Sequence, residues 1–146
     1  MNGKFGPVKG KINFDRTSLT GNFIDVVIDA GSIDTDNKTR DKHLKKEDYF
    51  FIEKYPSIKM KATLFSKEND GTYKGFFKLT IKDQIKDVIV PFTFKEANGK
   101  ANFTGSFQID RLDYKVGSSS FLLSNAVLLN INVDVEKLGH VEKKGN

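Results

Sequence analysis

The sequence lacks cysteine and tryptophan altogether and contains only two histidines. Without cysteine the chain can form no disulfide, no thiolate nucleophile and no cysteine-bound zinc site. Its continuous apolar runs fall far short of the roughly 18 residues that a bilayer-spanning helix requires. Residues 1–20 contain no apolar segment of the kind that defines a signal peptide, so the sequence as given predicts none.

Positive charge is in modest excess, with 24 lysines and arginines against 19 acidic residues and a formal net charge of +5. This balance permits attraction to anionic membranes or to nucleic acid. However, the lysines are scattered, and Lys59, Lys61, Lys74 and Lys78 each lie one position from an apolar residue. That pattern is typical of the solvated face of a sheet, so we expect no nucleic-acid partner.

The dominant feature that is present is an apolar–polar alternation of period two, in a chain with 13 phenylalanines. Such alternation predicts strands with one buried and one wet face. Seven segments show it: 12–14, 24–30, 58–64, 73–81, 88–94, 103–109 and 127–135. Residues 69–71 (NDG) and Asn98-Gly99 predict tight hairpin turns, and Gly21-Asn22 a weaker one. We therefore expect residues 1–146 to form one domain, a meander closed into a barrel or stacked as a sandwich.

Residues 34–56 do not alternate. The polar residues 34–37 are suited to cap a helix, and residues 38–47 have a helix-compatible composition. Pro56 then favours a return to extended chain. We expect a long connection with one or two helical turns, across one end of the barrel.

Four segments at fixed spacing carry a family resemblance: residues 32–37 (SIDTDN), 40–44 (RDKHL), 48–51 (DYFF) and 54–58 (KYPSI). Residues 79–82 (LTIK) and the set Gly105, Phe107, Arg111 and Gly117 add to it. Together they resemble the YceI-like family over nearly the whole chain. One departure is that Asp83 stands where the family has a turn glycine. A second is that the chain begins near the end of the usual first strand.

The resemblance implies an all-β fold, an antiparallel lipocalin-like extended β-barrel of about eight strands. One strand is expected to be shortened or missing at the N-terminus, and a short helical connection is expected around residues 38–50. Since an incomplete barrel leaves unpaired edges, a homodimer is a further expectation. Family habit places such proteins in the periplasm or elsewhere outside the cytoplasm, whereas the absence of a signal peptide here keeps a cytoplasmic location open.

The resemblance also implies a function without catalysis: binding of a polyisoprenoid, an isoprenoid quinone or a similar acyl chain inside the barrel. No cofactor is required for this. Apolar residues on the inward rows are the predicted cavity wall. They are Ile24, Ile28, Met60, Phe77, Leu79, Val90, Phe92, Phe107, Ile109, Leu129 and Ile131.

The pattern alone favours a simpler interpretation, in which these rows only fill a core. A filled barrel would then act through its surface, as a module that contacts a protein or transiently a membrane. The family resemblance is what favours a lipid cavity over a filled core.

Arg40, Asp41 and His43 invite a catalytic interpretation, because a histidine beside a carboxylate can act as a general base. No nucleophile motif accompanies them, and a network of ion pairs and caps explains them better. Arg40 and His43 are alternatively expected at the barrel mouth, where Arg40 would contact a polar headgroup. We expect no metal site, because a zinc site would need carboxylates beside His43 and His140, and residues 34–45 lack the glycine and glutamate of a calcium loop.

Overall fold

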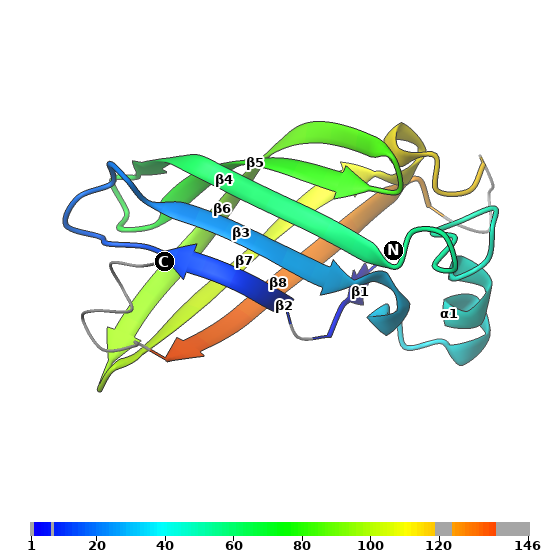
Figure 1. The fold of residues 1–146 in the computed structure, drawn as a ribbon, viewed down its shortest axis with the longest axis horizontal. Helices are drawn as coiled ribbons and strands as arrows, with labels where there is room; N and C mark the ends of the chain where they lie inside the picture. The colour runs from blue at the N-terminus through cyan, green and yellow to red at the C-terminus, as the bar shows by residue number, and fades with distance from the viewer. Residues whose placement is uncertain (1, 7, 119–123, 137–146) are drawn as a thin grey trace.

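The computed structural model describes residues 2–6, 8–118 and 124–136, which form one curled eight-stranded sheet (Figure 1). The strands follow the order β1-β8-β7-β6-β5-β4-β3-β2. Their bounds are β1 (Asn2–Lys4), β2 (Val8–Asn13), β3 (Phe23–Asp29), β4 (Ser57–Lys67), β5 (Tyr73–Ile81), β6 (Gln84–Ala97), β7 (Lys100–Asp110) and β8 (Ala126–Glu136). The described residues also form α1 (Lys38–Leu44) and the 3-10 helices η1 (Ala30–Ser32) and η2 (Arg111–Tyr114).

Strands β2 to β8 pair antiparallel with their neighbours in chain order, which confirms the predicted meander. The link between β6 and β7 is the two-residue turn Asn98-Gly99, and both residues have positive φ, 55° and 78°. Such a turn matches the right-handed twist of the strands that it joins. Gly21 and Gly71, in the other two predicted turns, also have positive φ. The turn residues thus set the hairpins at one end of the barrel.

The N-terminal segment joins the two edges of the sheet over a short stretch. Its first part, β1, pairs with β8, and its second part, β2, pairs with β3. The expected first strand is therefore present but only three residues long. The predicted antiparallel barrel is confirmed for β2 to β8, and the short pairing of β1 with β8 is parallel. The reason is geometric: seven successive antiparallel strands leave β2 and β8 running in the same direction, so one segment cannot oppose both β3 and β8.

The predicted alternation holds along the strands, with an error at Leu64. This residue shares the parity of Ile58, Met60 and Ala62 and was expected to face inward. It is 63% exposed, whereas Phe65 is buried. A β-bulge between Ala62 and Leu64 adds one residue to β4. Since side chains alternate between the two faces, one extra residue inverts the parity of every residue after it.

The non-alternating connection covers the opposite end of the barrel from the hairpin turns (Figure 1). Asn37 caps α1 by accepting a hydrogen bond from the Arg40 amide at 2.9 Å. The helix ends at Leu44, shorter than the predicted helical span of 38–50, and successive turns follow it. Leu44 is buried and Phe50 packs against the core. Within the described ranges, no helix is long and apolar enough to cross a bilayer.

Arg111 is a buried charged residue that fixes the connection between β7 and β8 at this same end. Its Nε donates to the Ser124 carbonyl at 3.0 Å, and its Nη1 donates to the Val116 carbonyl at 2.7 Å. Its Nη2 donates to the Ser118 carbonyl at 2.9 Å and to Asn125 Oδ1 at 3.3 Å. A planar guanidinium with five donors is suited to gathering several carbonyls at once.

We expect Arg111→Met to lower the free energy of unfolding by about 3 kcal/mol, because the variant leaves the buried Val116 carbonyl and the part-buried Ser118 and Ser124 carbonyls without their donor. Urea denaturation checks this. Arg16→Met is the matched control, since the Arg16 side chain is 54% exposed and its ion pair with Glu96 contributes at most about 1 kcal/mol. Equal urea midpoints for the two variants would contradict the structural role of Arg111.

Candidate ligand-binding site

Three cavities among the described residues follow one another along the barrel interior. The first, cavity 1, has a volume of about 50 Å³ and is lined by residues from seven strands, β2 to β8. Its wall is apolar apart from Thr104 and Gly105. The full lining is Val8, Ile12, Ile24, Val26, Ile28, Met60, Phe77, Val90, Phe92, Phe103, Thr104, Gly105, Ile131 and Val133.

The second cavity, of about 40 Å³, continues from the first, because Val8, Ile28, Met60 and Ile131 line both. The third, of about 20 Å³, continues from the second through Phe5, Ile81 and Leu129, and reaches Leu44 and Phe50 beside α1. The three cavities thus mark a narrow apolar path, interrupted by side chains, from the middle of the barrel to its helical end. None of them alone has the several hundred Å³ typical of an occupied ligand pocket.

All eleven residues predicted for the cavity wall line at least one of these cavities. Seven line cavity 1: Ile24, Ile28, Met60, Phe77, Val90, Phe92 and Ile131. Leu79, Phe107 and Leu129 line the second cavity, and Ile109 lines the third. The structure therefore places the predicted wall residues on one connected interior surface, while their contact with a ligand stays a prediction.

Sequence reasoning missed several lining residues, including Val8, Ile12 and Phe103 of cavity 1. The period-two alternation does predict that these residues face inward. Phe103 shares the inward parity of Phe107, and Val8 has the parity of Ile12 once the alternation is followed back through Gly10. Phe5 and Phe50, which line the helical end, come from irregular segments where parity predicts nothing.

Arg40 and His43 line none of the three cavities. Arg40 donates from Nε to Thr35 Oγ1 at 2.9 Å and from Nη2 to the Thr35 carbonyl at 2.8 Å. Asp41 accepts from the Thr35 amide and hydroxyl. His43 is exposed, with its ring 6.4 Å from that of Tyr49. These contacts agree with the network interpretation, in which Arg40 and Asp41 hold the buried Thr35 at the start of the helical connection.

We expect Arg40→Ala to lower the free energy of unfolding by about 2 kcal/mol, because two hydrogen bonds from a charged donor are lost. Thermal unfolding measures this effect. His43→Ala is the matched control on the same helix and should leave the melting temperature nearly unchanged. If Arg40→Ala weakened lipid binding while the melting temperature stayed the same, Arg40 would instead be a headgroup contact.

The shifted titratable groups lie away from the cavities. Burial raises the pKa of Tyr114 to about 12, so its hydroxyl stays protonated at neutral pH. Burial lowers the pKa of Lys82, whose Nζ donates to the Lys115 carbonyl at 2.8 Å. Hydrogen bonds from Thr72 and Gln84 lower the pKa of the exposed carboxyls of Asp70 and Asp83. In the part of the chain that the structure describes, no three His, Asp or Glu side chains are grouped to hold a metal.

Comparison with known proteins places this geometry in a family. The model of the YceI-like domain matches residues 1–135. A UPF0312 protein of Vibrio parahaemolyticus is 25% identical over 131 residues, covering 84% of this chain and 69% of that protein. A UPF0312 protein of Photorhabdus laumondii is 38% identical over 88 residues, covering 60% of this chain and 45% of that protein.

Two solved structures have a fold similar to that of this chain. The YceI protein of Campylobacter jejuni superposes with a TM-score of 0.81 and 29% identity, covering 93% of this chain and 84% of that one. BcnA of Burkholderia cenocepacia has the same fold, with a TM-score of 0.82, 22% identity and coverage of 91% and 86%. Since the family model spans the described sheet from β1 into β8, the chain belongs to the YceI-like family.

Proposed function

We propose that the barrel binds one linear apolar lipid, a polyisoprenoid, an isoprenoid quinone or a similar acyl chain, and carries, stores or senses it without chemical change. The observation that carries this proposal is the row of three connected apolar cavities along the barrel. A narrow, elongated path fits a chain better than it fits a compact ligand. The fold supports the same proposal, because the YceI-like fold is known as a polyisoprenoid-binding fold.

The residues that line the interior are mostly apolar, so a ligand would be held mainly by hydrophobic contacts. Burial of apolar surface contributes roughly 25 cal/mol per Å², so a long prenyl chain gains enough to offset its ordering. Polar lining groups are few: Thr104 in cavity 1, Asn130 and Asn132 in the second cavity, and Thr35 and Arg111 in the third. A ligand that needed many hydrogen bonds would lose them here.

The small cavity volumes require side chains to move when a lipid binds. Met60 lies between cavity 1 and the second cavity and lines both. An unbranched thioether side chain adopts several shapes at low cost, so Met60 is suited to give way. Ile131, which also lines both cavities, is only half-buried and lies just past the residues of β8 that pair with β1, so its side chain has room to shift. The closed interior is therefore compatible with a chain that takes the place of these side chains.

Native mass spectrometry of gently purified protein, with solvent extraction of the same sample, tests the proposal. We expect a bound mass that matches a prenyl lipid or a long acyl chain. Ile131→Trp should weaken the binding of an added quinone by about tenfold or more, because the ring fills the space shared by two cavities. Val27→Trp is the control, since Val27 faces outward on β3 and is 37% exposed. An empty barrel that also refuses added quinones would refute the proposal.

A second candidate function, contact with an anionic membrane, is supported by the outer face of the barrel. Leu64, Phe76 and Ile89 lie side by side across β4, β5 and β6, because Leu64 pairs with Phe76 and Phe76 with Ile89. They are 63%, 38% and 55% exposed. We name these three residues the outer row. Contiguous exposed apolar residues of this kind mark interaction surfaces.

Three lysines flank the outer row. Lys61 and Lys78 pair with each other on one side of it, and Lys74 lies on the other side. Each has an acidic partner: the Nζ atoms of Lys61, Lys74 and Lys78 lie 3.8, 3.2 and 2.7 Å from carboxylate oxygens of Asp25, Glu68 and Asp87. Exposed ion pairs of this kind contribute at most about 1 kcal/mol, so the lysines can exchange them for anionic headgroups.

We expect the double substitution Phe76→Asn and Ile89→Asn to reduce co-sedimentation with vesicles that contain phosphatidylglycerol by roughly tenfold. Val27→Asn, an exposed apolar residue outside the outer row, should leave binding unchanged. Equal binding by all three proteins would contradict the membrane contact. The outer row could instead contact a second copy of the chain, and analytical ultracentrifugation tests this alternative. A wild-type dimer that the double substitution dissociates would assign the outer row to that dimer contact.

A further inference from the structure

We propose that Phe14 is the stopper of the apolar path and sets the length of the chain that the barrel accepts. This inference rests on the proposed lipid binding and adds a specificity-determining residue to it. Phe14 follows the end of β2 at Asn13, so it belongs to the connection between β2 and β3 rather than to a strand. The Phe14 ring therefore enters the barrel from a loop and not from a strand, at the end that holds the Gly21, Gly71 and Asn98-Gly99 turns, which we call the hairpin end.

The ring of Phe14 is surrounded by five other aromatic rings from β4, β5, β6 and β7. Its centroid lies 4.9–5.7 Å from theirs, and all five contacts are edge-on. The five neighbours are Phe65, Tyr73, Phe92, Phe94 and Phe103. Edge-on aromatic pairs at these distances are favourable beyond the area that they bury. A single loop residue thus occupies the centre of this end.

Two of these rings connect the stopper to the cavities. Phe92 and Phe103 line cavity 1 and also contact Phe14, at 5.6 and 5.7 Å. Phe65, Tyr73 and Phe94 contact Phe14 without lining cavity 1. Cavity 1 therefore ends at a wall that the Phe14 ring supports, and the space beyond this wall is itself aromatic. Removing the Phe14 ring would leave an apolar void next to cavity 1, and the path would lengthen toward the hairpin end.

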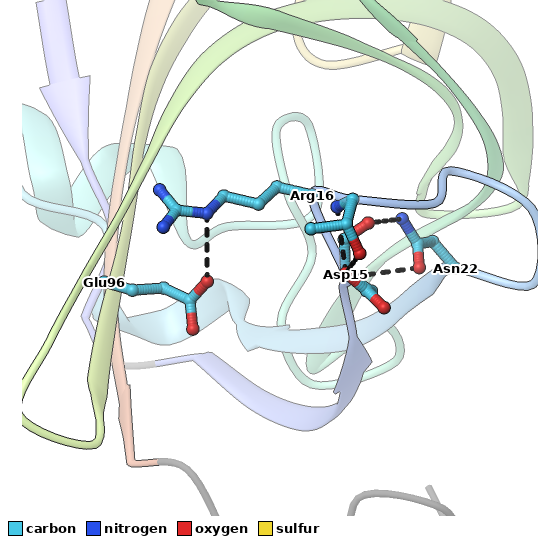
Figure 2. Close-up of polar contacts among 5 residues, drawn as sticks. Asp15, Arg16, Asn22 and Glu96 are labelled. Carbon is cyan, nitrogen blue, oxygen red and sulfur yellow. Dashed lines mark hydrogen bonds and ion pairs between the residues drawn. The ribbon is translucent and has the colours of Figure 1, made fainter.

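The residues after Phe14 hold it in place (Figure 2). The Asp15 amide donates to Asn22 Oδ1 at 3.0 Å, and Asn22 Nδ2 donates back to the Asp15 carbonyl at 3.1 Å. Asn22 is buried and Asp15 is exposed, so this reciprocal pair is partly shielded from water. Asp15 Oδ1 also accepts from the amide and hydroxyl of Thr17, at 2.9 and 2.6 Å.

Arg16 adds a contact across the barrel end. Its Nε lies 3.4 Å from Glu96 Oε1 on β6, and the Glu96 side chain is only 17% exposed (Figure 2). The backbone on both sides of Phe14 is held mainly by β2 before it and by the Asp15–Asn22 hydrogen bonds after it, and the exposed Arg16 ion pair adds little. A ring held this way does not swing aside as a free loop residue would, and this makes it a stopper rather than an adaptable filler.

The opposite end is also closed by an aromatic pair. Phe5 and Phe50 line the third cavity, with their rings 6.1 Å apart and edge-on. The apolar path is therefore bounded at both ends, and its length is a fixed property of the barrel. At the hairpin end the limit of the path depends on one side chain, because Phe14 contacts all five aromatic rings that surround it.

The test is a chain-length series of prenyl alcohols: geraniol, farnesol, geranylgeraniol and solanesol. Each displaces a fluorescent fatty acid from the full chain, first for the wild type and then for Phe14→Ala. We expect Phe14→Ala to shift the preferred alcohol to a longer one and to raise the affinity for it by roughly tenfold, the effect of burying about two further methylene groups. Phe51→Ala, which removes an equal ring outside the cavities, should leave the preferred length unchanged.

If the wild type and Phe14→Ala both bind and prefer the same alcohol, the stopper role is overturned while the proposed function stands. If neither protein binds the fluorescent fatty acid or any alcohol, the proposed function fails and the stopper role fails with it. If both bind the fatty acid and no alcohol displaces it, the stopper role is overturned while binding of an acyl chain stands. If only Phe14→Ala binds, the stopper role is supported, because the ring then blocks the path outright. Phe14→Leu covers the case in which the alanine variant does not fold, and it should give a smaller shift in the same direction.

Discussion

The constraint on which the rest of the structure depends is that a single sheet must bury its own apolar face. In the part of the chain that the structure describes, no second layer covers this face, so the sheet curls until the inward side chains of β2 to β8 meet one another. The same curling makes the interior an apolar tube. Met60, Phe77 and Leu79 are thus core residues and cavity-wall residues at once. Folding and lipid binding would draw on the same contacts, and each inward substitution affects both.

Much of the fold and of the cavity wall was predictable from the sequence, because period-two alternation needs only local information. Ile24, Ile28 and Val90 were assigned inward from their neighbours alone, and they line cavity 1. Leu64 was assigned wrongly, since a bulge depends on how β4 meets β5 and leaves no mark in the alternation. The role of Phe14 was also out of reach, because its ring contacts come from four other strands.

The structure narrows the question that the sequence left open, whether the barrel is filled or hollow. Its cavities are small, and rings and branched side chains occupy most of the interior. Yet the cavities share lining residues and lie in one row, which a uniformly packed core would not produce. A barrel that closes around its own side chains when empty avoids exposing a large apolar void to water. Under the proposed function, it would exchange those side chains for a ligand of similar chemistry.

The parallel junction between β1 and β8 also affects how the chain folds. It joins residues 2–4 to residues 128–130, close to the largest separation that the chain allows. Loop-closure entropy places such a contact among the last to form, after the local hairpins. During synthesis β1 leaves the ribosome well before its partner strand β8. The junction therefore has to wait until β8 is made, and until then the unpaired β1 is a surface that a chaperone would protect.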